Sequence, residues 1–215
     1  MRRYDQISGQ GTQRIEFLSD GVFAIALTIL VLDIKVPVSE NISSESSLVI
    51  AFSQLTPKLL AYFLSFMTLG IFWTAHTTQF YYIEKSDRNY NWLNLSFLLF
   101  VTIIPFTTAF LSEYITFKFA VGIYWLNLFL LGIMLSRMFS YADKHNYFKS
   151  NITGITEIKK AMIHRGIVAQ SLYAIGALLC FINTYISIAA LTIIQLLFVL
   201  AIFPKIKPKV VPGKK

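Results

Sequence analysis

One apolar segment near the start of the chain constrains the fold more than any other feature. Twelve uncharged residues separate Asp20 from Asp33, and Thr28 carries the only polar side chain among them. The apolar run extends from about residue 15 to residue 34. About 20 mostly apolar residues are enough for a helix to cross the roughly 30 Å hydrocarbon layer of a bilayer. The segment therefore predicts a transmembrane helix.

The rest of the chain has the composition of an integral membrane protein. Of its 215 residues, 55% are hydrophobic and only 14% are charged, and the mean hydropathy is +0.60. These values are too apolar for a soluble domain of this size. We expect an all-α integral membrane protein with a single domain, residues 1–215, and six transmembrane helices. The predicted spans are 15–34, 59–82, 92–111, 119–139, 166–183 and 185–203, followed by a basic cytoplasmic tail over 204–215.

Positive charge is segregated to one side of this six-span arrangement. All but three of the 19 basic residues fall there, and the exceptions are Lys35, Lys58 and Lys118. Because basic loops remain on the cytoplasmic side, we expect both termini to be cytoplasmic. The opposite side carries a serine-rich segment, residues 38–47, that is expected to be flexible. The lack of eukaryotic sorting motifs favours a bacterial plasma membrane.

The formal net charge of +8 is explained by this topology. The basic residues are spread over four loops and do not form a groove with aromatic platforms, so a nucleic-acid partner is not expected. The basic tail is instead expected to contact anionic lipid headgroups.

Residues with catalytic potential are too scattered to form an enzyme site. The single cysteine, Cys180, lies in the fifth predicted span, and the three histidines, His76, His145 and His164, are far apart in the sequence. The sequence contains no glycine-rich phosphate loop and no serine-elbow motif. We therefore expect no catalytic residue, no cofactor, no small-molecule substrate and no metal apart from a permeating ion.

Polar residues at the cytoplasmic ends of the first two predicted spans are expected to meet. Asp20 lies about 7–8 Å into the first span at 1.5 Å per residue, and His76 lies at a similar depth in the second. Trp73 shares a face with His76 at i, i+3 spacing. With Arg14 and Ser19 they form a predicted buried network. This network is either a clamp between two helices or a proton-sensing or proton-relaying site built on His76 and Asp20.

Four residues in the middle of the first predicted span share one helical stripe. Thr28, Ile29 and Leu32 follow Ile25 at spacings of three, four and seven residues, which places them on one face of a helix. Taken alone, this is ordinary packing. Copies of the chain around a symmetry axis would instead bring these side chains into rings. Rings of aliphatic residues gate by dewetting, and a ring of threonine hydroxyls replaces part of an ion's hydration shell.

Amide side chains also occur inside the predicted spans. Their ordinary role in a membrane protein is hydrogen bonding between helices or subunits. These residues are Asn94, Asn127, Gln170, Asn183 and Gln195.

The residues around the helical stripe resemble a known channel family. Residues 14–20, followed by residues 21–28, resemble the Arg-x-x-x-Phe-Ser-Asp signature of the transmembrane protein 175 family of potassium channels, with Leu18 in place of the phenylalanine. Residues 72–76 resemble the second-span Trp-x-x-His element of that family, and residues 94–105 fit its third span. The last three predicted spans fit by hydropathy alone.

The resemblance implies a homotetramer of six-span subunits whose first helices surround a central pore, without a re-entrant selectivity loop. Carried over by position, Ile25, Ile29 and Leu32 form the hydrophobic pore constriction, with Ile25 the narrowest. Thr28 supplies the hydroxyl groups for potassium selectivity. Asp33 either draws cations to the outer mouth or is a helix-end acid paired to a nearby lysine.

The sequence therefore predicts a leak-type, potassium-permeable ion channel. The alternative is a secondary transporter or a proton-coupled membrane carrier, which would show spans interrupted by glycine or proline in corresponding halves and a polar site at the midplane. Pro105 is the only candidate breaker within a predicted span, and the two three-helix halves show no evident sequence symmetry. A membrane enzyme and a purely structural membrane protein rank behind these two classes.

Overall fold

The described part of the chain is a bundle of long helices. The computed structural model describes residues 11–38, 42–150 and 155–200. In these ranges one isolated bridge, between Ile83 and Phe148, is the only extended pairing. The helices are α2 (Gln13–Ile29) with the 3₁₀ turn η1 (Leu30–Asp33), α3 (Glu45–Ser53), α4 (Thr56–Tyr82), α5 (Arg88–Glu113), α6 (Lys118–Lys144), α7 (Ile155–Leu178) with the 3₁₀ turn η3 (Leu179–Phe181), and α8 (Thr184–Val199). The predicted all-α fold is confirmed.

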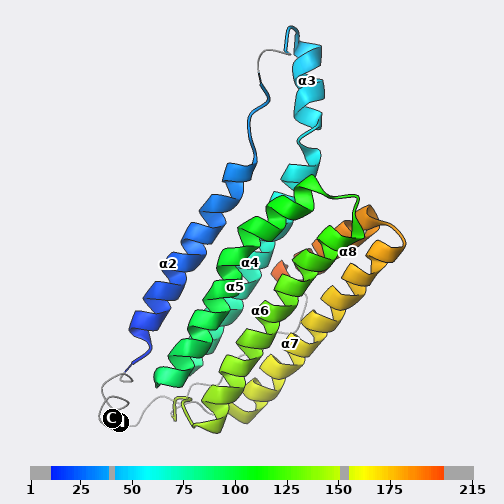
Figure 1. Cartoon of the computed structure of the whole chain (residues 1–215). Coiled ribbons are helices and arrows are strands. Elements are labelled where there is room, and N and C mark those ends of the chain that lie inside the picture. The colour runs from blue at the N-terminus through cyan, green and yellow to red at the C-terminus, as the bar shows by residue number, and fades with distance from the viewer. Residues whose placement is uncertain (1–10, 39–41, 151–154, 201–215) are drawn as a thin grey trace.

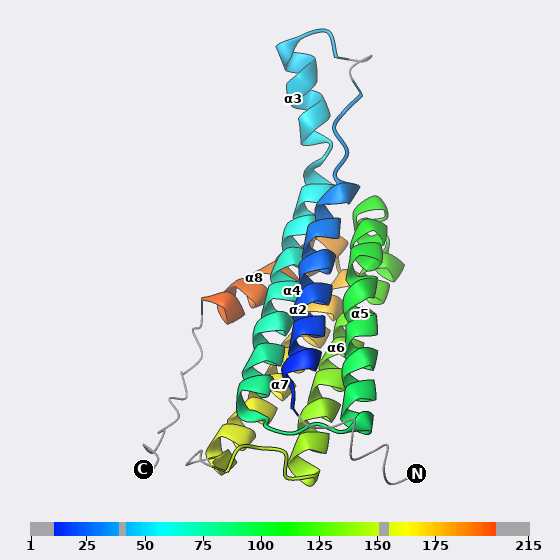
Figure 2. The same cartoon turned by 90° about the vertical axis from the view of Figure 1, so that its left-hand side faces the viewer.

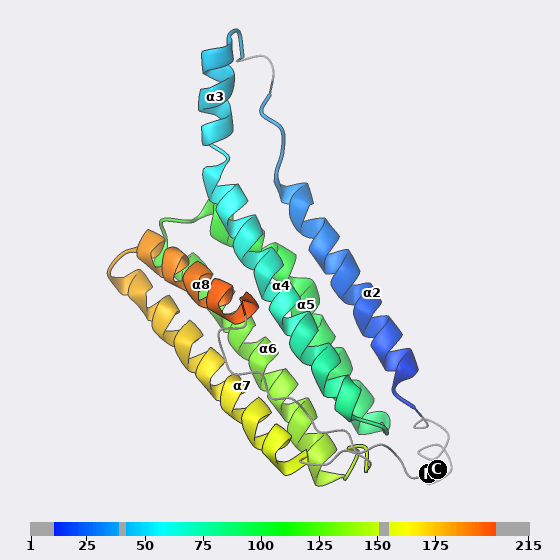
Figure 3. The same ribbon diagram turned by 180° about the vertical axis from the view of Figure 1, so that it is seen from behind.

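The five long helices run side by side (Figure 1). α2 lies at one edge of the bundle and packs on α4 and α5, whereas α7 lies at the opposite edge and packs on α6. α8 lies across the bundle on α4, α6 and α7, as the view from behind shows (Figure 3). α2 is therefore attached to the rest of the subunit through one side.

Five helices are long and apolar enough to cross a membrane. They are Gln13–Asp33, Thr56–Tyr82, Arg88–Glu113, Lys118–Lys144 and Ile155–Phe181. α8 is apolar but has only 16 residues, which extend about 24 Å at 1.5 Å per residue and fall short of a bilayer core of about 30 Å. The end of the sixth predicted span, residues 201–203, and the basic tail lie outside the described residues.

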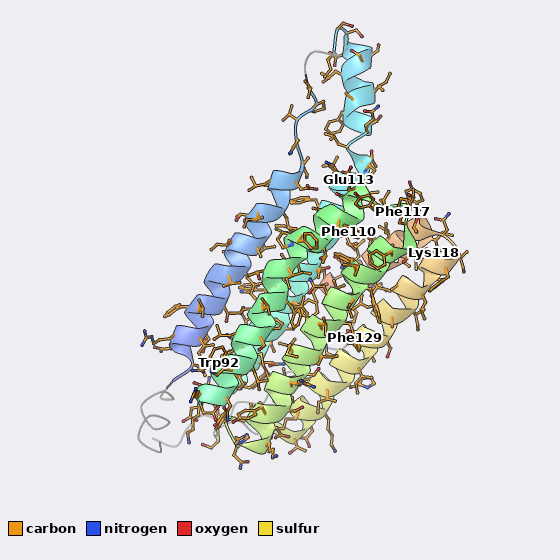
Figure 4. All side chains as sticks on the ribbon, in the orientation of Figure 1. Trp92, Phe110, Glu113, Phe117, Lys118 and Phe129 are labelled. Atoms are coloured by element: carbon orange, nitrogen blue, oxygen red, sulfur yellow. The ribbon has the colours of Figure 1, made fainter. Side chains whose placement is uncertain are left out.

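Aromatic side chains mark the two ends of α5. Trp92 is exposed near its start, and Tyr114 is exposed directly after its end. Figure 4 shows Trp92 at one end of the helix and Glu113 at the other. Tyr114 follows Trp92 by 22 positions, which correspond to about 33 Å of helix, close to the thickness of the hydrocarbon layer. Because tryptophan and tyrosine gather at both membrane interfaces, this spacing fits a helix that crosses the bilayer.

A short helix occupies part of the segment that was expected to be flexible. α3 begins after Ser44, whose Oγ accepts a hydrogen bond from the Ser47 backbone N–H at 3.2 Å, while Ser47 Oγ accepts from the Ser44 N–H at 3.0 Å. This reciprocal capping fixes the first turn of the helix. α3 projects beyond the long helices (Figure 2), and none of its residues is buried. The serines that suggested a flexible linker are in part helix caps.

Two positions, Asn183 and Pro105, are where the sequence could end or break a helix. The predicted spans 166–183 and 185–203 leave room only for a tight turn between them. The chain reverses at Asn183, whose side-chain oxygen accepts from the Tyr185 backbone N–H at 2.8 Å and so caps α8. Pro105, the candidate breaker, lies inside α5, and the helix continues through it. The broken helix expected of the transporter alternative is therefore not found at Pro105.

Candidate pore-lining face and helix clamp

α2 buries one face and leaves the other exposed. Its buried residues are Ser19, Phe23 and Ala26, continued by Leu30 in η1. The Phe23 ring packs at 5.9 Å from that of Phe97 in α5. Burial of these side chains attaches α2 to the bundle through the apolar area that it removes from water or lipid. No other residue that the structure describes covers the remaining face of α2.

The stripe predicted from the sequence lies on this uncovered face. Ile25 is 60% exposed and Leu32 is 70% exposed, and Ile29 and Thr28 are exposed as well. A row of large aliphatic side chains with no partner in its own subunit is typical of a surface that contacts another protein chain or lipid.

The hydroxyl group of Thr28 is partly engaged by its own helix. Its Oγ1 donates to the backbone carbonyls of Ala24 and Ile25, at 3.0 and 2.9 Å. A threonine hydroxyl has one proton and two acceptor lone pairs. Since the proton is directed to the backbone, the oxygen lone pairs remain free to face a cation.

An apolar groove of about 460 Å³ adjoins the stripe between α2 and α4. Thr28 lies at the border between the two features, because it belongs to the stripe and also lines the groove. The other lining residues are Ala24 and Leu27 of α2, Val31 of η1, and Tyr62 and Phe66 of α4.

A buried polar cluster joins α2, α4 and α5 in the N-terminal half of α2. The amide oxygen of Asn94 pairs with His76 Nε2 at 2.8 Å, and its amide nitrogen donates to Ser19 Oγ at 3.1 Å. All three side chains are at most 1% exposed. Because an amide oxygen only accepts, the contact assigns the ring proton of His76 to Nε2. Asn94 is thus the central residue of this cluster.

The Asp20–Trp73 pair forms a separate contact between α2 and α4. Trp73 Nε1 donates to Asp20 Oδ1 at 2.9 Å, and both side chains are partly exposed. The side chain of Arg14 is exposed and makes no hydrogen bond or ion pair to any residue that the structure describes. The five residues predicted to form one network are therefore divided: Ser19 and His76 meet through Asn94, Asp20 meets Trp73, and Arg14 meets neither group.

Asp33, the last residue of η1, forms a hydrogen bond with α5. Asp33 Oδ2 accepts a hydrogen bond from Ser112 Oγ at 3.2 Å. In the described ranges no ion pair joins Asp33 to Lys35. The only ion pair near this end is between Lys58 and Glu113, at 3.9 Å.

Sequence reasoning did not assign Asn94 to the cluster. It identified this residue only as an amide within a span, suited to hydrogen bonding between helices. A signal was nevertheless present, because Asn94 lies about one and a half turns from the start of α5, at a depth similar to that of His76 in the neighbouring α4.

The fold and these contacts define an α-helical integral membrane protein whose first spanning helix is held by polar contacts on one side and exposes an aliphatic stripe on the other. The sequence model of the family described as the endosomal/lysosomal potassium channel TMEM175 matches residues 14–105. The matched region contains α2, α4 and most of α5, and so includes both the stripe and the polar contacts.

Relatives and solved structures extend the match over most of the chain. A potassium channel of Chamaesiphon minutus is 31% identical over 192 residues, which are 88% of this chain and 94% of the relative. The crystal structure of a lysosomal potassium-selective channel TMEM175 homolog from the same organism has a TM-score of 0.74 and 30% identity, and the match covers 88% of this chain and 96% of that one. The chain belongs to the TMEM175 family, which confirms the predicted resemblance. This is a family of ion channels and not of enzymes.

A relative that matches over a shorter region has a different description. The endosomal/lysosomal proton channel TMEM175 of Homo sapiens is 42% identical over 98 residues, which are 43% of this chain but only 19% of the human protein. The match to the human protein therefore concerns a single region of it.

Proposed function

We propose that the chain is the subunit of a homotetrameric, leak-type potassium channel in which four α2 helices surround the pore. The observation that carries this proposal is the uncovered aliphatic stripe of α2, with Ile25 60% and Leu32 70% exposed in the subunit. The family supports it, as do the Chamaesiphon minutus relative, which is a potassium channel, and the solved potassium-selective homolog from the same organism.

In the proposed tetramer, Ile25, Ile29 and Leu32 form successive aliphatic rings around the axis, with Ile25 the narrowest. Such rings exclude water from a narrow pore and so limit ion flux. The oxygens of Thr28, whose protons are directed to the backbone, replace part of the hydration shell of a potassium ion. The apolar groove beside the stripe provides the surface on which the neighbouring subunit packs. No cofactor takes part, and potassium is the permeating ion.

The polar contacts at the other end of α2 are assigned to holding the helix in place. His76 is 1% exposed, and its ring lies parallel to that of Phe97 at 5.2 Å and at 4.6 Å from that of Phe80. An enclosed ring whose Nε2 is already hydrogen-bonded to Asn94 is better suited to a clamp than to proton transfer with water. The hydrogen bond between Trp73 and Asp20 adds a contact between α4 and α2.

Asp33 is assigned to the outer mouth of the pore, where its carboxylate raises the local concentration of cations. The proposed location is a bacterial plasma membrane, with both termini in the cytoplasm and the membrane lipids as the other partners.

Reconstitution of the purified protein tests the proposal. Native mass spectrometry should find four copies of the 24.5 kDa subunit, and liposome currents under a potassium/sodium gradient should be ohmic and reverse towards the potassium equilibrium potential. Saturable, non-ohmic flux would instead support a secondary transporter or proton-coupled carrier. Conduction by a monomer would contradict the proposal, because a single α2 helix cannot form a ring around a pore.

A further inference from the structure

A second buried polar cluster lies away from the α2 stripe and joins four other helices. The hydroxyl of Tyr124 in α6 lies 3.2 Å from Ser65 Oγ and 3.0 Å from Thr68 Oγ1, both in α4. Thr108 Oγ1 of α5 lies 2.6 Å from Ser65 Oγ. Gln195 of α8 donates through Nε2 to Thr68 Oγ1. Each of these side chains is at most 3% exposed.

Several buried polar atoms next to this cluster have no partner among the residues that the structure describes. They are Oε1 of Gln195, the hydroxyl of Tyr173 in α7, and both amide atoms of Asn127 in α6. Gln195, Tyr173 and Asn127 are 0%, 2% and 4% exposed. Buried polar groups of native proteins are nearly always hydrogen-bonded to protein or to ordered water. Three such side chains in one region therefore indicate a bound species.

Contacts between the helices place these unpaired groups in one region. The Tyr173 ring stacks on Phe198 with the ring centres 6.2 Å apart, and Phe198 lies one turn after Gln195 on α8. Gln195 Nε2 and the Tyr124 hydroxyl both contact Thr68 Oγ1. Asn127 follows Tyr124 by three residues on α6 and so lies on the same face. The unpaired atoms thus belong to side chains that adjoin the contacts of Tyr124 and Gln195 with Thr68.

We propose that each subunit holds ordered water between α6, α7 and α8, bridging the Tyr173 hydroxyl, Gln195 Oε1 and the Asn127 amide. Every side chain in the region is neutral, and the described residues contain no group of acids able to hold a metal ion there. A bare cation in such a site would lack a counter-charge. Water needs none, because it both donates and accepts, and proteins contain roughly one buried water per 27 residues, each making about three hydrogen bonds.

The bound water helps to fix the position of α8, the apolar helix of 16 residues. α8 reaches α4 through Gln195, whose Nε2 is bonded to Thr68 and whose Oε1 is directed to the water. Tyr173 connects α7 to the same water. The water therefore links α7 and α8 to the helices α4, α5 and α6. α2 packs on two of these helices, α4 and α5.

The Tyr173→Phe substitution tests this proposal by the sign of its effect. If water is bound, loss of the hydroxyl removes a satisfied hydrogen bond, and the Tm of the purified assembly should fall by about 2–4 °C. If the hydroxyl is unpaired, its removal relieves a buried polar group, so an unchanged or raised Tm overturns the proposal. Tyr185→Phe is the matched control, since Tyr185 is 52% exposed and should leave the Tm unchanged.

A density map at a resolution near 2 Å provides the second measurement, and the proposal requires both results. A peak should lie about 3 Å from both the Tyr173 hydroxyl and Gln195 Oε1. Absence of that peak overturns the proposal. The difference in Tm between the wild type and Tyr173→Phe should also be the same in potassium chloride and in choline chloride. A difference that disappears without alkali ions would identify the bound species as a cation and exclude water.

Discussion

The amide oxygen of Asn94 lies 2.8 Å from Nε2 of His76, and the amide nitrogen of the same side chain donates to Ser19 at 3.1 Å. A single residue of α5 thus joins α2 to α4. This contact lies on the buried face of α2, opposite the aliphatic stripe. Any displacement of the cluster therefore changes the position of the proposed pore-lining face.

Asn94→Leu should lower the thermal stability of the assembly, because it leaves the Nε2 proton of the buried His76 without an acceptor. Ser19 keeps its hydrogen bond to the Ile15 carbonyl. The expected cost is about 1–3 kcal/mol per subunit. Combining it with His76→Phe should recover much of the loss, since replacing both partners by apolar groups is nearly neutral. Thermal unfolding of the two single variants and the double variant measures the coupling. Strictly additive losses would show that the Asn94–His76 contact does not stabilise the protein.

Ile25→Asn should increase the potassium conductance of the tetramer several-fold. Four polar amides in place of four aliphatic side chains lower the cost of keeping the constriction wet. Single-channel recording in bilayers measures the effect. Ile175→Asn is the matched control, because Ile175 is also exposed but lies on α7, at the edge of the bundle opposite α2. If the two variants conduct equally and like the wild type, the constriction lies elsewhere.

Asp20→Ala and Trp73→Phe should each weaken the tetramer while leaving its ion preference unchanged. Both remove the bond from Trp73 Nε1 to Asp20 Oδ1, which is 2.9 Å long and has a charged acceptor. Because the pair is partly exposed, the expected loss is about 0.5–1.5 kcal/mol. Thermal unfolding and reversal potentials are measured on the same preparations. A stable tetramer with altered selectivity would place Asp20 in the ion pathway.

Much of the first helix and the position of its exposed face could be predicted from the sequence. The uncharged run between Asp20 and Asp33 requires a spanning helix, and the spacing of the aliphatic residues defines its stripe. The stripe is found on the uncovered face of α2 because the opposite face carries Phe23 and Ala26, which pack on the bundle. The depth argument also brought α2 and α4 together correctly, as the Trp73–Asp20 bond shows.

The partners within the polar cluster were harder to predict. Periodicity indicates which face a residue occupies but not which neighbouring helix covers that face. Asn94 was therefore recognised as an amide within a span but not as the link between Ser19 and His76. Arg14 was expected in the same network, yet its side chain is exposed and forms no hydrogen bond or ion pair with the residues that the structure describes. The capping role of Ser44 in α3 was missed because the serines at the start of this helix resemble those of a linker.

Gly132→Ala should destabilise the contact between α6 and α7. A Cβ at this position would lie 1.5 Å from Nε2 of Gln170 and therefore cannot be accommodated unless that side chain moves. The Tm should fall, and the additional change Gln170→Ala should relieve the clash. Gly122→Ala is the control on the same helix, since its Cβ would meet no atom within 4 Å and alanine favours a helix. Equal Tm values for the Gly132 and Gly122 variants would contradict the proposed close packing.

Thr28→Val should reduce selectivity for potassium over sodium while leaving the fold intact. Valine keeps the shape of threonine but deletes the oxygen, so potassium loses ligands that replaced part of its water. Thr28→Ser is the control, because serine keeps a hydroxyl that is able to donate to the Ala24 and Ile25 carbonyls in the same way. Bi-ionic reversal potentials in liposomes should shift towards zero for the valine variant and stay near the wild-type value for the serine variant. Identical reversal potentials in all three proteins would remove Thr28 from the permeation pathway and place selectivity at the aliphatic rings or at the outer mouth near Asp33.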